Sequence, residues 1–282
     1  MKKIEITLVS KHNNRKFIAD ANFLDDGKSK PVIIFNHGFK GFKDWGPFNL
    51  VANQFAKAGF VFIKMNFSHN GVTLENPNEF ADLEAFAKNN FCMELDDTGV
   101  LIDYLFSPSC TIPRSEIDLN NLYIMGHSRG GAAAILKANE DPRIKKLVTW
   151  AAVNNLESWH SKDEIDDWKK QGRIFINNAR TNQQMPMDYQ LVENFIENSE
   201  RLQVPDAIKN MQIPMLSIHG SADPTVPVAV VKQIKAWNSS VNIEIIEGAD
   251  HTFGGGHPFT IPELPRDLDT VVKLTIDFFK SV

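Results

Sequence analysis

Residues 123–132 read YIMGHSRGGA, in which four mostly apolar residues lead into a glycine, a serine and two further glycines. Ser128 stands between Gly126 and Gly130 in a G-x-S-x-G spacing, which is weak alone because serines in glycine-rich turns are usually structural. Here the apolar run indicates a strand that ends at Gly126, and a helix is expected beyond Ser128. A sharp strand-to-helix turn crowds the backbone and requires small neighbours. The context therefore favours Ser128 as a nucleophile.

The rest of the chain repeats this alternation of apolar runs and helical patterns. A helix is expected after Pro47 and ends near Gly59, another covers 91–106, and the last carries Leu268 on its apolar face. The first two strands are separated by a hairpin signal. Strands are predicted at 4–9, 16–23, 31–38, 60–67, 121–126, 146–153, 214–220 and 242–248. This order predicts an α/β fold with a mostly parallel sheet flanked by helices.

One segment interrupts the alternation. Residues 156–213 are charged and rich in aromatic residues, and they show no convincing strand. An insertion of this length is more than a connecting loop. We expect a helical cap insertion at 156–213 and a core domain formed by 1–155 and 214–282.

A serine hydroxyl needs a base, and a histidine is the usual choice. Of the eight histidines, His251 and His257 lie in GADHTFGGGHPF, the loop after the last predicted strand. His251 is favoured because it lies three residues past that strand, whereas His257 follows three glycines and is interpreted as a surface-loop residue.

The histidine in turn needs a carboxylate to orient it. Asp250 is adjacent to His251, but neighbouring side chains rarely face each other in that way. Glu157 is the only acid after the 146–153 strand. Asp223 follows a strand end in GSADPTVP and is preferred. Ser128, Asp223 and His251 then follow three different strands, at the edge where open α/β sheets bind ligands.

Backbone N–H groups must also stabilise the negative oxygen of the transition state. One is expected from Arg129, directly after the serine, and the other from Phe39, or less favourably Lys40, in HGFKG after the first long apolar run. The basic residues Lys40, Lys43 and Arg129 lie near the expected site and could attract an anionic substrate, but they are interpreted here as solvated surface charge. Substrate contacts are assigned to His37, His127, Trp159 and Met185.

Composition excludes several classes of protein. The net charge of −5 argues against a broad nucleic-acid surface, and two cysteines are too few for a disulfide framework. No apolar run approaches the length of a membrane span, and the N-terminus does not read as a signal peptide. We expect a cytoplasmic protein that binds a small molecule and binds neither nucleic acid nor membrane. The sequence does not decide the oligomeric state, and a dimer is one option.

The motifs HGFKG, GHSRGG, GSADPTVP and GADHTF stand in the order used by the α/β-hydrolase superfamily, which the whole chain resembles. Within it, the chain is similar to bacterial esterases grouped with dienelactone hydrolases and cinnamoyl or feruloyl esterases. The resemblance implies an eight-stranded, mostly parallel sheet, a serine acyl-enzyme mechanism, and neither a metal nor an organic cofactor. Dienelactone hydrolases proper have a cysteine where this chain has Ser128.

These observations predict a serine carboxylesterase that acts on a small-molecule ester. The alternatives are an amide, peptide or thioester hydrolase, an acyltransferase with the same three side chains, or a non-catalytic binding scaffold, since the fold does not select the reaction. The aromatic residues and methionines of the insertion have two interpretations of about equal weight. They bind an apolar or aromatic acyl group of the substrate, or they form the insertion's own core.

Overall fold

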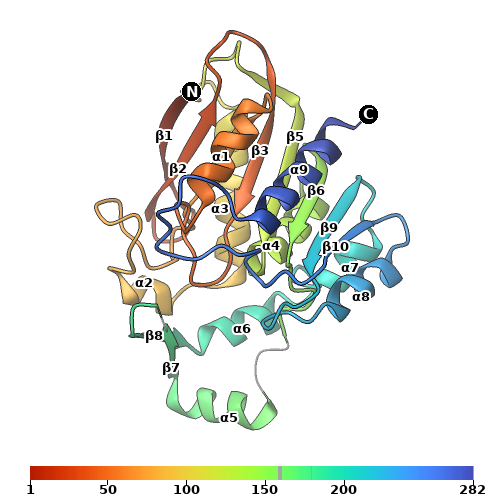
Figure 1. Cartoon of the computed structure of the whole chain (residues 1–282). Coiled ribbons are helices and arrows are strands. Elements are labelled where there is room, and N and C mark those ends of the chain that lie inside the picture. Colours follow the sequence, from red (N-terminus) through yellow and green to blue (C-terminus); the bar gives the residue numbers. More distant parts are fainter. Residues whose placement is uncertain (158–160, 179, 282) are drawn as a thin grey trace.

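The computed structural model describes residues 1–157, 161–178 and 180–281. Its centre is an eight-stranded sheet with the order β1-β2-β4-β3-β5-β6-β9-β10 (Figure 1). The eight strands are β1 (Lys2–Val9), β2 (Lys16–Phe23), β3 (Lys30–Asn36), β4 (Val61–Met65), β5 (Ile117–His127), β6 (Ile144–Trp150), β9 (Met215–Gly220) and β10 (Asn242–Ile246). The predicted α/β fold is confirmed.

Strand β2 runs antiparallel to both β1 and β4, and every other pairing in this sheet is parallel. The parallel register places Asn36 of β3 beside Gly126 of β5, and His127 beside Trp150 of β6. The loops that follow these strands therefore meet at one edge of the sheet, the lower edge in Figure 1.

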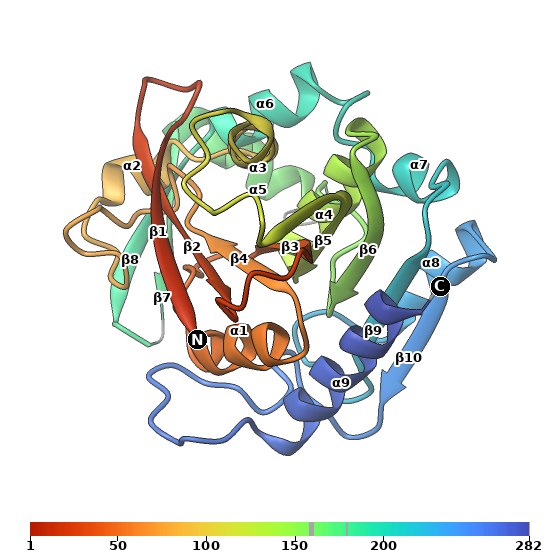
Figure 2. The same ribbon diagram turned by 90° about the horizontal axis from the view of Figure 1, so that it is seen from above.

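Helices cover both faces of the sheet (Figure 2). Helices α1 and α9 bury Phe55 and Val271 in one apolar core, and α3, α4 and α8 bury Leu101, Ile135 and Ile234 in the other. The helices are α1 (Phe48–Lys57), α2 (Leu83–Ala87), α3 (Phe91–Phe106), α4 (Arg129–Glu140), α5 (Lys162–Gln171), α6 (Gln190–Glu197), α7 (Val204–Lys209), α8 (Ala229–Trp237) and α9 (Arg266–Lys280). Within the described residues, no helix is both long and apolar enough to cross a bilayer.

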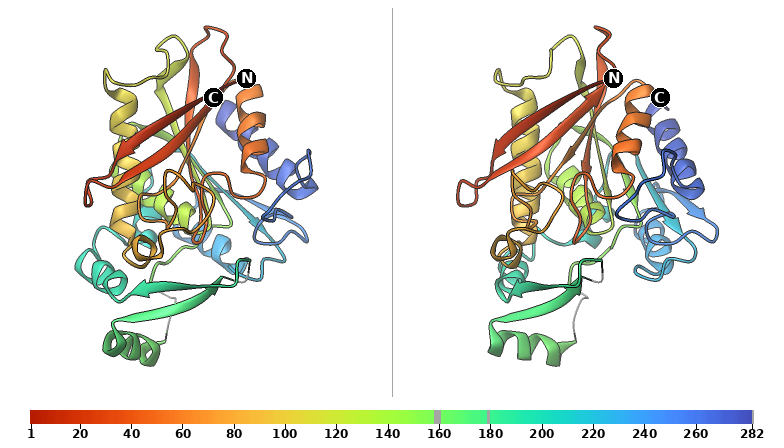
Figure 3. Two further views of the ribbon diagram at one scale, coloured as in Figure 1. Left: turned by 90° about the vertical axis from the view of Figure 1, so that its left-hand side faces the viewer. Right: turned by 60° about the vertical axis from the view of Figure 1, so that its left-hand side comes forward.

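The expectation that 156–213 contains no strand is wrong. Strands β7 (Arg173–Asn178) and β8 (Gln183–Asp188) form an antiparallel pair between α5 and α6. Figure 3 shows this pair and α5 beyond the edge of the main sheet. Pro186 has no N–H group to donate to a neighbouring strand, but β8 pairs on one side only, with β7, and so tolerates it.

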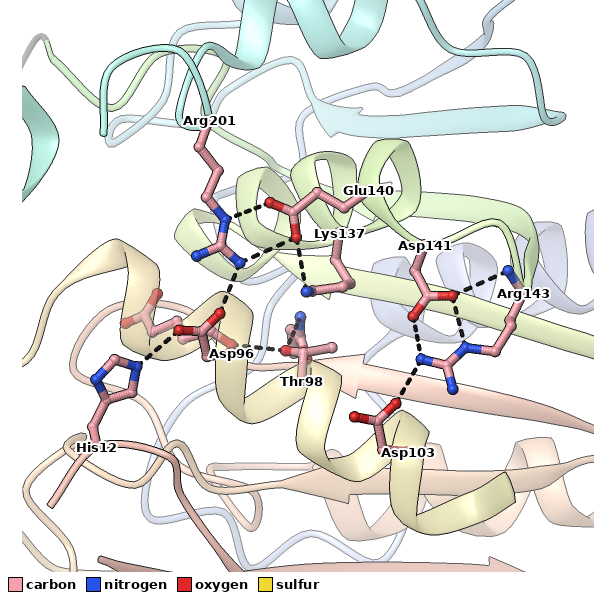
Figure 4. Close-up of polar contacts among 11 residues, drawn as sticks. His12, Asp96, Thr98, Asp103, Lys137, Glu140, Asp141, Arg143 and Arg201 are labelled. Carbon is pink, nitrogen blue, oxygen red and sulfur yellow. Dashed lines mark hydrogen bonds and ion pairs between the residues drawn. The ribbon is translucent and has the colours of Figure 1, made fainter. Parts of the chain in front are cut away.

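The end of this inserted segment is tied to the core by charged side chains (Figure 4). The Arg201 guanidinium contacts Asp96 of α3 at 2.8 Å and Glu140 of α4 at 2.5 Å. Asp96 also contacts His12 in the β1–β2 turn at 2.9 Å, and Glu140 contacts Lys137 at 2.8 Å. This network connects four segments that are distant in sequence.

Candidate active site

Ser128 occupies the turn between β5 and α4, as the sequence indicated. Its backbone has φ 56° and ψ −123°, a conformation that L-residues rarely adopt. Its N–H donates to the Trp150 carbonyl at 2.8 Å, and its own carbonyl accepts from Gly131 at 2.9 Å. These bonds hold the strained turn and leave the serine partly exposed beyond the sheet edge.

The neighbouring glycines are required by close backbone approach. A Cβ atom at Gly126 would lie 2.1 Å from the Gly130 carbonyl oxygen, and one at Gly130 would lie 2.3 Å from the carbonyl oxygens of Asn36 and His37. Strand β3 and the start of α4 therefore pack closer together than any side chain permits.

His251 and Asp223 are brought together from the loops after β10 and β9. The His251 Nδ1–H group donates to Asp223 Oδ2 at 2.8 Å, and the histidine side chain is 16% exposed while the carboxylate is fully buried. Asp223 Oδ1 accepts the N–H groups of Thr225 and Val226 at 2.8 and 2.9 Å. Burial alone would raise the pKa of Asp223, but hydrogen bonds from His219, His251 and the Val226 amide outweigh it and hold the pKa well below its usual value.

His219 is a neighbour of this pair that the sequence did not single out. It is fully buried in β9, its Nε2–H donates to the Val226 carbonyl at 2.8 Å, and the same nitrogen lies 3.4 Å from Asp223 Oδ2. His219 therefore fixes the turn that carries Asp223. Its position four residues before the aspartate is the only sequence signal, and it is a weak one.

The alternative residues have other roles in the structure. Asp250 accepts the N–H groups of Thr252 and Gly254 and so closes its own loop. His257 accepts the Gly46 N–H at 3.0 Å and stacks on Trp45, and it is partly buried, which corrects its interpretation as a surface-loop residue.

His127 lies against His251, with 4.8 Å between the ring centroids. Its Nε2–H donates to the His251 carbonyl at 2.8 Å. Burial, followed by the charge of His251, lowers the pKa of His127 to about 3. The neutral ring of His127 therefore supports the backbone of the His251 loop.

Two adjoining cavities open at this edge of the sheet, and both are lined by Phe39, Lys40, Ser128 and His251. Cavity A has about 690 Å³ of empty space and cavity B about 1200 Å³. The residues particular to cavity A include His127, Trp45, Phe48, Asn178 and Arg180. Those particular to cavity B include Arg129, Asn154, Asn155, Thr225 and Val226.

Arg129 is not a solvated surface charge, contrary to the expectation. Its side chain is 4% exposed, and its guanidinium contacts Glu94 of α3 at 2.8 Å and covers the rings of Phe91 and Phe39 at 4.5 and 5.3 Å. This buried pair packs the first turn of α4 against the loop after β3. The N–H of Arg129, at the first position of α4, and the loop residue Phe39 both flank cavity B.

Lys43 is also buried, again contrary to the expectation. Its ammonium group contacts Asp20 of β2 at 2.6 Å and Asp44 at 2.5 Å, and its N–H donates to Asn66 at 2.7 Å. Lys64 of β4 contacts the same two aspartates. These four charges, which we call the buried quartet (Asp20, Lys43, Asp44 and Lys64), anchor the loop that carries Phe39.

Two of the assigned substrate contacts are corrected. His37 is 3% exposed and donates through Nδ1 to the Gly38 carbonyl at 2.9 Å, so it supports the loop instead of lining a cavity. Met185 is fully buried in the apolar core. His127 does line cavity A, and Trp159 lies outside the described residues. Across the described part of the chain, no group of three or more His, Cys, Asp or Glu side chains could hold a metal ion.

The sheet order, the serine turn and the positions of the loops define an α/β hydrolase. The chain belongs to the prolyl oligopeptidase family, whose model matches residues 48–260 and so includes Ser128, Asp223 and His251.

Several proteins and solved structures to which this chain is similar are named as esterases or hydrolases. The chain is 29% identical over 141 residues to "Putative esterase/lipase 2" of Mycoplasma genitalium, and the match spans 50% of this chain but only 44% of that protein. Est1E from Butyrivibrio proteoclasticus with bound ferulic acid is similar with a TM-score of 0.71 and 16% identity, over 97% of each chain. A dienelactone hydrolase from Anabaena variabilis has a TM-score of 0.63 and 17% identity, over 99% of this chain and 98% of that one.

Proposed function

We propose that the protein hydrolyses a small-molecule carboxylic ester through an acyl-enzyme intermediate. Ser128 is the nucleophile, His251 the general base and acid, and Asp223 the residue that orients His251. The observation that carries the proposal is the 2.8 Å hydrogen bond between Asp223 and His251, whose ring lines the same two cavities as Ser128.

In the first half-reaction, His251 Nε2 takes the proton of Ser128 as Oγ attacks the ester carbonyl carbon. The Nδ1–H group of His251 already donates to Asp223, so the imidazolium that forms is stabilised by an ionised carboxylate. The N–H groups of Phe39 and Arg129 donate to the oxygen that becomes negative, each worth about 3–4 kcal/mol in such sites. His251 then protonates the departing alkoxide.

In the second half-reaction, water replaces the alcohol. His251 takes a proton from the water as it attacks the acyl carbon, and the tetrahedral intermediate then collapses to the free acid as His251 returns that proton to the departing Ser128 Oγ. The low pKa of Asp223 keeps it charged throughout, as both steps require.

The relatives support an ester substrate. The names of the Mycoplasma relative and of the Rhodothermus marinus esterase domain, to which the chain is similar with a TM-score of 0.66, refer to esterases. Within the inserted segment, Trp168, Met185 and Met187 are buried in the apolar core that the main sheet, α3 and α4 also form, so these residues favour a packing role over an acyl pocket.

A peptide substrate is the competing candidate, because the family takes its name from peptidases. Both candidates use the same three side chains and differ in the leaving group that His251 must protonate. A cytoplasmic location and the division at residues 156 and 213 stay predictions from the sequence.

The test compares wild-type protein with Ser128→Ala on a p-nitrophenyl ester and on the p-nitroanilide with the same acyl group. We expect ester hydrolysis by the wild type at a rate well above that on the anilide, and a loss of at least about 10³-fold in Ser128→Ala. Equal ester rates in the two proteins would contradict the proposal, and a faster anilide reaction would favour the peptide candidate.

A further inference from the structure

The side chains of Lys and Arg that line cavity A give it positive charge next to Ser128. Two cationic side chains line it, Lys40 from the loop after β3 and Arg180 from the β7–β8 connection, and no acidic side chain does. Lys40 is partly buried and Arg180 is exposed. The cavity is therefore positively charged.

The two cations are held in place without being neutralised. Arg180 donates to the Lys40 carbonyl at 2.7 Å, and its guanidinium lies 5.6 Å from the Trp45 ring centroid. The Lys40 ammonium group is 3.4 Å from the Asn177 carbonyl. Of the ion pairs in the described chain, none includes either residue, whereas Lys43, Lys64 and Arg129 nearby are all paired.

A third donor points to a missing acceptor. Asn178 is 2% exposed and lines the same cavity, and its Nδ2 group has no hydrogen-bond partner among the residues that the structure describes. A buried amide without a partner costs free energy that a bound acceptor restores. An oxygen group in cavity A would serve this role.

The electrostatics of Lys40 agree with the geometry. Burial, followed by the positive charge of Arg180, lowers the pKa of Lys40 from its usual value. A negative group between the two cations would reverse that effect, since an opposite charge favours the ionised form.

We infer that cavity A binds an anionic oxygen group, a carboxylate or a phosphate, carried by the ester substrate near its reacting carbonyl. The inference rests on the proposed function, because it assigns a substrate class to the same site. Trp45 also lines cavity A, and the Arg180 guanidinium approaches its ring. The part of the substrate that links the ester to the anion would pack against this ring.

The binding experiment uses Ser128→Ala protein, which holds an ester without cleaving it, and calorimetry with three matched ligands. These are dimethyl terephthalate, monomethyl terephthalate and the methyl ester of 4-phosphonooxybenzoic acid. We expect at least one of the two anionic ligands to bind about tenfold or more tightly than the neutral one, with a preference that weakens at high salt. The tighter of the two anions identifies the group.

Variants locate the binding. In the Ser128→Ala background, Arg180→Gln and Lys40→Gln should each reduce the preference for the anionic ligand about tenfold. The control is Lys169→Gln, which removes an exposed cation of α5 outside the cavity and should leave the preference unchanged. Equal binding of neutral and anionic ligands, no binding of either anion, or the same loss in Lys169→Gln would overturn the inference.

The kinetic arm separates the two proposals. If wild-type protein cleaves the neutral diester with Ser128 but shows no preference for the anions, the proposed function stands and the inference fails. If Ser128→Ala protein binds the anions through Arg180 and Lys40 but the wild type cleaves none of the three esters, the inference stands and the proposed function fails.

Discussion

The carboxylate that orients His251 was a choice among three acids in the sequence, and the structure distinguishes them by their hydrogen bonds. Asp223 accepts from His251, whereas Asp250 accepts backbone N–H groups within its own loop. Glu157 lines a separate apolar cavity with Phe91 and Trp168. Only the contact of Asp223 bears on the orientation of His251, so replacing Asp223 should affect activity more than replacing Asp250 or Glu157.

Asp223→Asn should lower kcat by about 10⁴-fold, because an amide cannot stabilise the imidazolium and favours the wrong tautomer of His251. Steady-state kinetics on a p-nitrophenyl ester would measure this loss. The matched control is Asp250→Asn, which changes the same group next to His251 and should keep kcat within about tenfold. A larger effect in Asp250→Asn than in Asp223→Asn would contradict the assignment.

At the scale of elements, the contact between β3, β5 and α4 depends on the absence of a side chain at Gly130. Gly130→Ala should lower the free energy of unfolding by about 3 kcal/mol or more, because its Cβ would meet two backbone carbonyls that cannot move independently. Gly99→Ala in α3 is the control, since its Cβ would meet only the end of the Lys137 side chain at 3.4 Å. That variant should gain about 0.5–1 kcal/mol from helix propensity.

Urea denaturation of both variants would measure these changes. A Gly130→Ala protein as stable as the wild type would contradict the close approach of the three elements.

The buried quartet is a second contact between elements, because its ion pairs attach the Phe39 loop to β2 and β4. Lys64→Met would leave Asp44 without one of its two cations, and removing one partner of a buried pair costs about 3–5 kcal/mol. The double variant Lys64→Met/Asp44→Asn should recover part of that loss. A double-mutant cycle by urea denaturation measures the coupling, and additive effects of the two changes would show that the two charges do not interact.

At the scale of the whole molecule, buried titratable groups make stability depend on pH. Burial lowers the pKa of His37 and His69 to about 4 and of His127 to about 3, from 6.5. Burial raises the pKa of Asp97 from 3.8 to about 6. Between about pH 6 and pH 4, the imidazoles gain protons mainly in the unfolded chain and the carboxyl of Asp97 mainly in the folded one.

Unfolding in this range therefore takes up a net of about two protons. The neutral, buried histidines contribute fully to the free energy of unfolding above pH 6.5, and this contribution is lost as the pH falls. Asp97 changes the free energy of unfolding in the opposite direction. The free energy of unfolding should fall by roughly 2–3 kcal/mol for each pH unit of acidification. Urea denaturation at pH 6, 5 and 4.5 tests the slope, and Asp97→Asn should steepen it; a stability that rises on acidification would contradict the pKa directions.

The sequence predicted the main sheet well because its strands are long apolar runs and its helices have start and stop signals. It also placed Ser128, Asp223 and His251 after three strands, and parallel strands bring such positions together. It missed both β7 and β8, and in β8 Pro186 and several polar residues mask the strand pattern. The burial of Lys43 and Arg129 depends on Asp20, Lys64 and Glu94, whose proximity only the tertiary fold creates. Asn178 and Arg180 reach cavity A for the same reason.

The central claim is that Ser128 is the nucleophile of an α/β hydrolase. Its most direct test is labelling with a fluorophosphonate, followed by mass spectrometry of the intact protein and its peptides. The account requires one adduct per chain on the peptide that contains Ser128, formed by the wild type and absent from Ser128→Ala. An adduct on another residue, or equal labelling of the two proteins, would contradict it.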